Sequence, residues 1–358
     1  MSSTNIEPRR DFQDDASTRK GRQDGPRSQR IEVFNDGTHR HFLGHQQTGI
    51  FRRLSDAFKP TGSVDEPSTT RSFGEKYGKC EKIIHYGGSS SVRLHHGSTK
   101  DIRDKELYAV KVFHHYSKRT IDDPLRSELS IAFRLKHANV IRTIEILDND
   151  RGELCLVMDY CGAGDLQSLI VASGKLKAVE ADCFFKQLMR AISYLHDSGI
   201  AHQNLNPDDI LLTVYGSVKV GDFGEASWVQ GSLQRQKSLS REPYGSILYQ
   251  PPEAILGTSS DPRPGDVWAA ALIYMAMKTG RRLWNIASKE DKEFEKYLST
   301  RSDESGYLPI HRLHNVHCQN VIYAMLHPEP PHRLLAWETL RSEWVQEIIV
   351  CDAGNTGG

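Results

Sequence analysis

The sequence lacks any apolar run that approaches the roughly 18 residues of a membrane-spanning helix. Its first 20 residues also lack the apolar core of a secretory signal. Neither sign of charge is in excess, because Lys plus Arg and Asp plus Glu both number 46. No bulk field therefore draws the chain to nucleic acid or to an acidic membrane. These absences predict a cytoplasmic protein with no membrane span and no nucleic-acid partner.

Paired cysteines are missing as well. The six cysteines are scattered, with no Cys-x-x-Cys pair among them. In a chain of 358 residues, which is long enough to build a core without cross-links, this spacing favours buried, reduced thiols over disulfides or zinc ligands. The cysteines are Cys80, Cys155, Cys161, Cys183, Cys318 and Cys351.

Apolar residues make up only 38% of the chain, which indicates that part of it is unpacked. Residues 1–70 are poor in apolar side chains and rich in Ser, Thr, Arg, Asp, Gln and Gly. Such a segment cannot bury enough surface to offset its ordering entropy, so we expect a disordered polar extension there. Within it, Arg52-Arg53-Leu54-Ser55 is either a solvated charge cluster or a phosphorylation site for a basophilic kinase. We expect residues 350–358 to form a flexible tail.

The rest of the chain changes its hydrophobic period from that of strands to that of helices. We therefore predict an α+β protein with two lobes: a small β-rich lobe at about 77–158, a hinge at about 159–164 and a larger helical lobe at about 165–349. In the first lobe the expected strands are 80–84, 91–95, 107–113, 140–146 and 153–158, with a helix at 124–136. In the second lobe the expected helices are 165–173, 180–198, 266–278, 318–326 and 336–349.

Chemistry-bearing residues gather in a few short motifs. Residues 201–212 read Ala-His-Gln-Asn-Leu-Asn-Pro-Asp-Asp-Ile-Leu-Leu, and Gly-Asp-Phe-Gly follows at 221–224. Upstream, Ala109-Val110-Lys111 precedes Glu128 by 17 residues from lysine to glutamate. These motifs, in this order and with 20 residues from His202 to Asp222, resemble the eukaryotic protein kinase domain over about residues 77–349. The resemblance implies the two-lobed protein kinase fold.

The resemblance also implies that ATP and Mg²⁺ bind between the lobes. Lys111 would pair with the α/β-phosphates and with Glu128. Asp222 would supply a hard oxygen to Mg²⁺, and Asp209 would be a second metal ligand. The positions implied to contact the nucleotide are Gly87, Val92, Ala109, Lys111, Met158, Asp159, Cys161, Asp165 and Leu211.

The loop implied to cover the phosphates has lost two of its three glycines. Gly87 remains, whereas His85 and Ser90 stand in the other two positions. Glycines let backbone amides approach phosphate closely, so we expect the two side chains to crowd this loop. Taken alone, the segment is as compatible with an ordinary hairpin turn.

The catalytic loop departs further from the family pattern His-Arg-Asp-Leu-x-x-x-x-Asn. Asn204 occupies the position of the aspartate that accepts the proton of the attacking hydroxyl, and an amide cannot do so. Asp209 occupies the position of the asparagine. Asn206 replaces a lysine that helps to hold the transferred phosphoryl group, and Gln203 replaces an arginine that pairs with a phosphate on the activation segment.

Two functions remain open on these residues. The first is a nucleotide-binding pseudokinase, a partner for a regulatory protein, because loss of a general base costs about 10²–10⁴-fold in rate. The second is an active serine/threonine kinase that acts on a protein substrate, with Asp208 or Asp209 as substitute base. Phosphorylation of Ser238 or Ser240 is not expected to be the switch, because Gln203 carries no charge.

Other motifs concern the fold and the subgroup. Glu253 is expected to pair with Arg333, and Asp266 begins a core helix. Segments at 76–79, 180–188 and 280–284 resemble the fungal halotolerance and nitrogen-permease-reactivator serine/threonine kinases. This closer resemblance implies regulation of nutrient or ion transporters.

Overall fold

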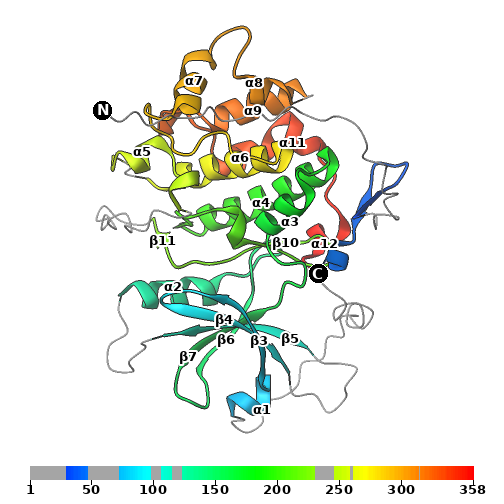
Figure 1. Ribbon diagram of the computed structural model, residues 1–358, viewed down its shortest axis with the longest axis vertical. Coiled ribbons are helices and arrows are strands. Elements are labelled where there is room, and N and C mark those ends of the chain that lie inside the picture. Colours follow the sequence, from blue (N-terminus) through cyan, green and yellow to red (C-terminus); the bar gives the residue numbers. More distant parts are fainter. Residues whose placement is uncertain are drawn as a thin grey trace, which may run out of the picture.

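The computed structural model describes residues 30–46, 72–97, 106–114, 123–229, 246–258, 261–313 and 315–358. A small lobe built on a β-sheet lies against a larger helical lobe, and the chain passes between them after β7 (Leu154–Asp159) (Figure 1). The expected α+β class with two lobes is confirmed. Within the described ranges, no helix has both the length and the apolar character that crossing a membrane requires.

The small lobe is an antiparallel sheet of five strands in the order β3-β4-β5-β7-β6. On one face, Val110 and Val112 of β5 lie opposite Val157 and Cys155 of β7, and α1 covers them with two aromatic rings. Helix α2 buries Leu129, Ile131 and Ala132 in the main core. The elements are α1 (Phe73–Tyr77), β3 (Cys80–Tyr86), β4 (Ser90–His96), β5 (Leu107–Phe113), α2 (Asp123–Arg134) and β6 (Thr143–Asp148).

The large lobe is organised around α4 (Ala178–Asp197) and α6 (Arg263–Thr279). Helix α6 has apolar residues on all sides, a pattern that predicts a buried central helix. In the structure 13 of its residues are buried. One long helix was expected over 336–349, but the chain breaks it at Ser342, which caps a second helix. The remaining helices are α3 (Leu166–Ser173), α5 (Pro252–Ile255), α7 (Lys292–Thr300), α8 (Leu308–His311), α9 (Val316–Met325), α10 (Ala336–Arg341) and α11 (Glu343–Glu347).

Short hairpins and 3₁₀ turns hold the loops between the lobes. Strand β8 pairs with β11, and β9 pairs with β10. Both pairs are antiparallel, and together they bring the ends of the segment 200–228 back beside each other. These elements are β8 (Ile200–Ala201), η5 (Pro207–Asp209), β9 (Ile210–Leu212), β10 (Val218–Val220), β11 (Ser227–Trp228), η6 (Ser246–Tyr249) and η7 (Pro330–His332).

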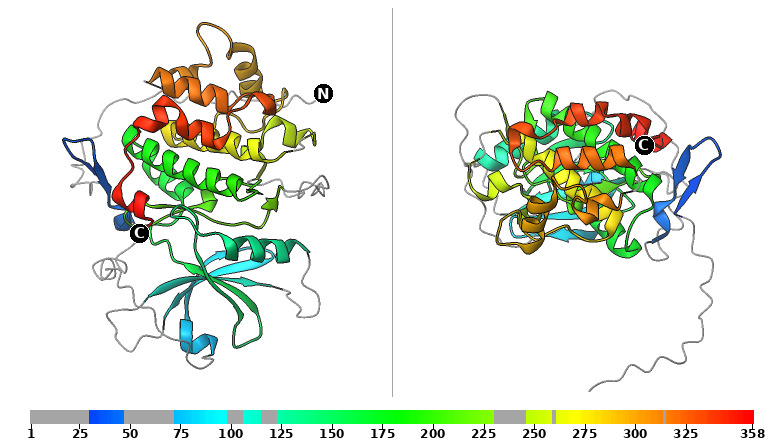
Figure 2. Two further views of the ribbon diagram at one scale, coloured as in Figure 1. Left: turned by 180° about the vertical axis from the view of Figure 1, so that it is seen from behind. Right: turned by 90° about the horizontal axis from the view of Figure 1, so that it is seen from above.

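The expectation of disorder over 1–70 is wrong for residues 30–46. These form a hairpin of β1 (Ile31–Val33) and β2 (His39–His41), followed by η1 (Leu43–Gln46). The hairpin lies along the outer side of the helical lobe (Figure 2). Its composition is polar, but the guanidinium of Arg30 donates two hydrogen bonds to the fully buried Glu180 of α4, at 2.7 and 2.8 Å. The segment 52–55 lies outside the described residues.

The expectation of a flexible tail over 350–358 is also wrong. Helix α12 (Asp352–Thr356) ends the chain, and Val350 and Cys351 before it are buried. The amide oxygen of Asn355 accepts a hydrogen bond from Arg190 of α4 at 2.9 Å. Of the six cysteines, all free, five are buried as expected, whereas Cys80 is exposed.

The expected pair between Glu253 and Arg333 is present and buried. Two parallel bonds join the guanidinium to the carboxylate, with Nη1–Oε1 at 2.6 Å and Nη2–Oε2 at 3.0 Å. Arg333 also donates to the carbonyl oxygen of Pro264 at 3.0 Å, which ties α6 to this pair. The bidentate geometry therefore joins α5, which carries Glu253, to the helical core.

Replacing Glu253 by alanine would leave the Arg333 guanidinium buried and uncompensated. We expect the free energy of unfolding to fall by about 3–5 kcal/mol, measured by chemical denaturation. The matched control is Arg263→Ala, which breaks the Arg263–Asp261 pair, whose side chains are 41% and 40% exposed. That change should cost less than about 1 kcal/mol. Equal losses in the two variants would contradict a structural role for the buried pair.

Candidate functional site

Three charged side chains from separate elements meet between the lobes. Nζ of Lys111 on β5 lies 2.6 Å from Oε1 of Glu128 on α2 and 3.0 Å from Oδ1 of Asp222. The resemblance to the kinase pattern implied this contact between Lys111 and Glu128, and the two side chains are in contact. The bonds of Lys111 therefore join the sheet and α2 to the loop of Asp222.

Burial and charge act against each other at these three groups. Burial alone would lower the pKa of Lys111, but the charges of Asp222 and Glu128 raise it above its ordinary value. Burial raises the pKa of Glu128 in spite of Lys111. Burial also acts to raise the pKa of Asp222, but Lys111 outweighs it, so that pKa is lowered. Lys111 and Asp222 therefore remain a charged pair at neutral pH.

The loops that carry the catalytic-loop motif and Asp222 are fastened to the core through Asp266. Its two carboxylate oxygens accept the backbone N–H groups of His202 and Gln203, both at 2.8 Å. The His202 ring contacts the Phe223 ring, with centroids 5.6 Å apart, and its Nε2 lies 2.9 Å from the carbonyl oxygen of Gly221. Asp222 takes a left-handed backbone conformation, with φ of 55°. A non-glycine residue accepts this strain only where its surroundings impose it.

The side chain of Asn206 links the backbone at Asn204 to the carboxylate of Asp209. Its Nδ2 donates to the backbone carbonyl oxygen of Asn204 at 3.0 Å and to Oδ2 of Asp209 at 2.5 Å. Oδ1 of Asn204 is buried without a hydrogen-bond partner among the described residues. Asn206 also caps the turn that leads to Asp209, accepting the N–H of Asp208 at 2.9 Å. The side chain in the lysine position is thus committed to bonds within its own loop.

Asp209 is the most strongly perturbed carboxyl group of the site. Burial, with added repulsion from Asp222 and Asp208, raises its pKa to about 8. The hydrogen bond from Asn206 and the charge of Lys111 oppose this rise but are smaller. Asp209 and Asp222 are therefore close enough to repel each other, as expected of two carboxylates that share one cation.

The uncharged side chain of Gln203 makes two hydrogen bonds that were not predicted from the sequence. Its Nε2 donates to the carbonyl oxygen of Glu225 at 3.0 Å and to Oγ of Ser227 at 2.7 Å, and its backbone has a φ of 66°. Two neutral hydrogen bonds thus hold the chain at β11. The resemblance implies that β11 lies near the start of the activation segment, residues 223–253. The polar side chain of Ser227 was the only sequence signal for this contact. Ser238 and Ser240 lie outside the described residues.

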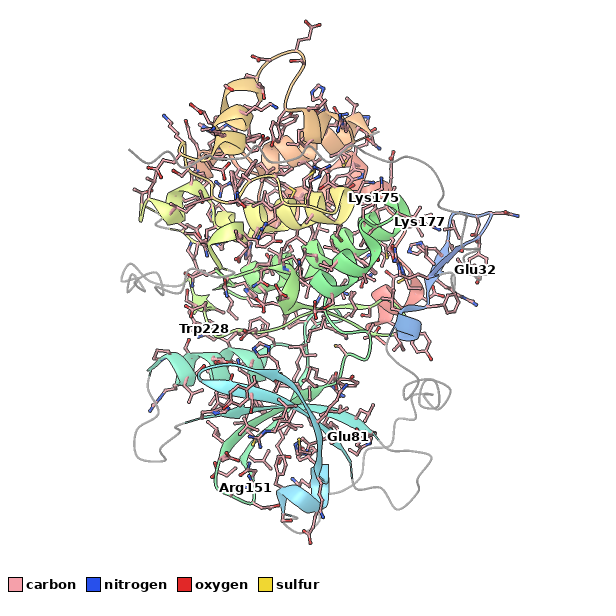
Figure 3. All side chains as sticks on the ribbon, viewed as in Figure 1. Glu32, Glu81, Arg151, Lys175, Lys177 and Trp228 are labelled. Atoms are coloured by element: carbon pink, nitrogen blue, oxygen red, sulfur yellow. The ribbon has the colours of Figure 1, made fainter. Side chains whose placement is uncertain are left out.

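Trp228, next to Ser227 on β11, lies where the two lobes face each other (Figure 3). The guanidinium carbon of Arg134 at the end of α2 lies 5.6 Å from the centroid of the Trp228 ring. This cation–π contact adds a second link between α2 and the activation segment. Helix α2 is therefore held at Glu128 by Lys111 and at its C-terminal end by Trp228.

The positions implied to line the nucleotide pocket come from both lobes. Val92 pairs with Lys111 across β4 and β5, and Ala109 pairs with Met158 across β5 and β7. In the hinge, burial raises the pKa of the Cys161 thiol to about 12, which keeps it neutral. The carboxylate of Asp159 is paired with Arg142 at 2.8 Å. The structure thus places Val92, Ala109 and Met158 on neighbouring strands of one sheet.

Asp165 and Leu211 approach from the large lobe, where an isolated β-bridge pairs them. The carboxylate of Asp165 caps α3 by accepting the N–H of Ser168 at 2.7 Å and its hydroxyl at 2.9 Å. This cap was not foreseen, because the sequence resemblance implied only that Asp165 contacts the nucleotide. The cap holds the carboxylate in place at the mouth of the hinge.

The loop of Gly87 is tight but does not require glycine. The N–H of Gly87 donates to the carbonyl oxygen of Ser90 at 2.9 Å. A Cβ placed on Gly87 would meet this oxygen at 3.4 Å and the His85 imidazole at 3.5 Å, which are ordinary contacts. The His85 imidazole thus lies beside Gly87. Crowding of this loop by His85 and Ser90 stays a prediction.

Comparisons with known proteins agree with this geometry. The family described as "Protein kinase domain" matches residues 80–345. The chain is 43% identical over 298 residues to serine/threonine-protein kinase hal4 of Schizosaccharomyces pombe, over 82% of this chain and 47% of that protein. It is 41% identical over 294 residues to serine/threonine-protein kinase HAL4/SAT4 of Saccharomyces cerevisiae, over 79% of this chain and 48% of that protein.

A third relative is serine/threonine-protein kinase HAL5 of Candida glabrata, 32% identical over 287 residues, which are 72% of this chain and 35% of that protein. The chain spans about half the length of the first two relatives and about a third of the third. The family match covers most of the chain and includes every charged residue of the site described above. The chain therefore belongs to the protein kinase family, and its relatives are fungal serine/threonine kinases of the HAL4 and HAL5 type.

Proposed function

We propose that this chain binds Mg-ATP in a kinase cleft and transfers phosphate poorly or not at all. One contrast carries the proposal. On the nucleotide side of the cleft, Lys111, Glu128 and Asp222 are already joined at 2.6 and 3.0 Å. On the side of the attacking hydroxyl, Asn204 presents an amide that cannot accept a proton. Such a protein acts in signalling through its nucleotide-dependent shape and its protein partners.

The residues present fit Mg-ATP. Asp209 and Asp222 offer the hard carboxylate oxygens that Mg²⁺ prefers, and their mutual repulsion is relieved by a cation. Lys111 would hold phosphate oxygens, and Asp165 lies beside Leu211 at the mouth of the hinge. Bound Mg-ATP would supply the γ-phosphoryl group and the charge neutralisation for its transfer. The crowded loop of Gly87 weakens phosphate binding but leaves these contacts intact.

Loss of transfer has two separate causes in the catalytic loop. Asn204 cannot orient and deprotonate a substrate hydroxyl as a carboxylate does. Asn206, in the position of the lysine, bonds Asn204 and Asp209 at 3.0 and 2.5 Å and carries no charge for a phosphoryl group. Both the base and the cation that act in the transition state are therefore missing.

One observation favours the second candidate, an active serine/threonine kinase. Asp209 has a pKa of about 8, a value suited to a general base at neutral pH. Asp208 is the alternative base, and its pKa is also raised, chiefly by burial and by Asp165. In that case the chain would transfer the γ-phosphate of ATP to protein serine or threonine, in the cytoplasm, and regulate nutrient or ion transporters.

Mg-ATP should raise the melting temperature of the protein, because ligand that binds only the folded state stabilises it by about 2.7 kcal/mol at 100 times the dissociation constant. Lys111→Met should abolish the shift in a thermal-shift titration. Lys76→Met is the control, since Lys76 pairs with Glu145 elsewhere in the same lobe. A flat titration of folded native protein at millimolar nucleotide would remove the nucleotide-binding proposal.

Asn204→Asp alone should recover little transfer, because Asn206 and the loop of Gly87 remain unchanged and residues that act as a unit are not additive. A radiolabel assay on a generic protein substrate would compare it with the triple variant Asn204→Asp, Asn206→Lys, Asp209→Asn. We expect the triple variant to be the more active. Turnover of roughly 1–100 s⁻¹ in the single variant, as in ordinary kinases, would contradict this assignment of the defect.

Asp209 should make the magnesium-free protein less stable as pH rises. Its pKa is about 8 when folded and 3.8 in its ordinary state. Between these values the folded state holds a proton that the unfolded state has released, so stability falls from about pH 4 to pH 8. Asp209→Asn removes this proton uptake. Its melting temperature should therefore exceed that of the native protein by more at pH 8 than at pH 5.

The control for this pH series is Asp197→Asn, at the exposed end of α4. It should not change the pH dependence. Added Mg²⁺ should narrow the difference between native and Asp209→Asn proteins at pH 8, because a cation stabilises the ionised carboxylate. A constant difference from pH 5 to pH 8 would show that Asp209 is already ionised in the folded protein.

A further inference from the structure

Four buried side chains that can ligate a metal meet at the outer edge of the helical lobe. They are His39, His41, Cys183 and Cys351, and one ligand atom from each lies within 4.8 Å of the others. They come from β2, α4 and the segment that precedes α12, which the views show side by side (Figure 1, Figure 2). None of the four belongs to the cleft between the lobes.

The sequence places the two imidazoles on one face of β2. Successive side chains of a strand point to opposite faces, so residues at a spacing of two share a face. His39 and His41 are 3% and 1% exposed, whereas Arg40 between them is exposed. The hairpin thus turns its two histidines toward α4 and its charged residue toward solvent.

The ring nitrogens of these two histidines are buried and lack hydrogen-bond partners among the described residues. Nδ1 and Nε2 of His39 and of His41 are all buried without a hydrogen-bond partner among the described residues. Buried polar groups are normally paired, and an unpaired one indicates either stored strain or an ion that satisfies it. Two adjacent imidazoles in this condition point to a shared ligand.

The two thiols complete the set from the other side. Cys183 and Cys351 are buried and free. Nε2 of Gln187, one turn after Cys183 on α4, donates to its Sγ at 3.3 Å. The backbone N–H of Gly354 donates to Sγ of Cys351 at 3.3 Å. Donors directed at sulfur stabilise thiolates, which are the form in which cysteine binds metal.

Packing around the cluster holds the imidazoles in position. The His41 ring stacks on Phe184 of α4, with centroids 4.8 Å apart. A Cβ on Gly216, whose φ is +87°, would lie 2.5 Å from the His41 ring, so this glycine makes room for it. The pair of half-buried Arg30 and buried Glu180 holds the start of the hairpin one turn away along α4. The site is therefore built from several elements rather than formed by chance at a surface.

We propose that His39, His41, Cys183 and Cys351 bind one structural zinc ion that fastens the hairpin and the C-terminal segment to α4. Two sulfurs and two nitrogens are a zinc donor set, and four protein ligands leave no open position for catalysis. Ligand atoms around tetrahedral zinc lie about 3–4 Å apart, so the cluster would contract by about 1 Å. Binding converts both thiols to thiolates and releases their protons.

Zinc can reach the cluster from solvent. A hollow lined by Phe34, Thr38, His39, Arg40, Val350, Cys351 and Asp352 opens beside it. Two of these lining residues, His39 and Cys351, belong to the proposed ligands. This proposal departs from the sequence-based expectation, which favoured buried, reduced thiols over zinc ligands. That expectation rested on the missing Cys-x-x-Cys spacing, but here the ligands come from distant parts of the chain.

The test is the metal content of the full chain, purified without a polyhistidine tag and measured by mass spectrometry of metals. We expect about one zinc per chain. Cobalt added after removal of zinc should give the visible absorption of tetrahedral Co²⁺ with thiolate charge-transfer bands. Chelation should also lower the melting temperature and speed proteolytic cleavage of the hairpin. Folded wild-type protein that neither contains zinc nor takes it up would overturn the proposal.

Variants then assign the ligands. Cys351→Ser and His41→Gln should retain zinc at least about tenfold less well than the native protein. The matched controls are Cys318→Ser and His95→Gln, which alter buried residues outside the cluster. Equal zinc loss in the controls, or a Cys183–Cys351 disulfide in the protein as isolated, would contradict the assignment. If a variant fails to fold, the zinc content and cobalt spectrum of the wild-type chain decide alone.

Discussion

The buried carboxylate of Asp266 is the contact on which the geometry of the cleft depends. It accepts two backbone N–H groups of the catalytic loop at 2.8 Å, and Nε2 of His196 lies 2.9 Å from it. Its own helix, α6, is buried on nearly all sides and is tied to Arg333. These charge-assisted hydrogen bonds are made to the backbone and do not depend on the side chains of the loop. Asp266 can therefore hold the backbone of the loop although Gln203, Asn204 and Asn206 differ from the family pattern.

This separation of scaffold from chemistry accounts for the mixed character of the site. Lys111, Glu128 and Asp222 match the kinase sequence pattern, whereas Asn204 and Asn206 of the catalytic loop differ from it. Gln203 illustrates the result: it lost the charge that binds a phosphate but gained two neutral bonds to Glu225 and Ser227. The chain near β11 is consequently held by neutral hydrogen bonds. An arginine at position 203 would instead pair with a phosphate added to the activation segment.

Much of the fold and the contact between Lys111 and Glu128 could be predicted from the sequence. Short-range periodicity marks elements such as β5 and α6, and the resemblance of the motifs to the kinase pattern implies pairs such as Lys111 with Glu128. What failed depends on contacts between distant segments. Residues 30–46 and 350–358 look unpacked by local composition, yet Arg30 pairs with the buried Glu180 of α4, and Cys351 is buried against the same helix. Local composition cannot indicate a partner that lies 150 residues away along the chain.

The hairpin also affects the order in which the chain can complete its fold. It is synthesised before the sheet lobe, but the surface on which it packs includes Cys351, which is 310 residues beyond His41. Contacts of such separation close only after the entropy of the long intervening loop has been overcome, and they form late. The small lobe and the helical core can therefore fold before the hairpin packs against Cys351. The packing of its two histidines against Cys351 therefore requires that the chain has been synthesised at least as far as residue 351.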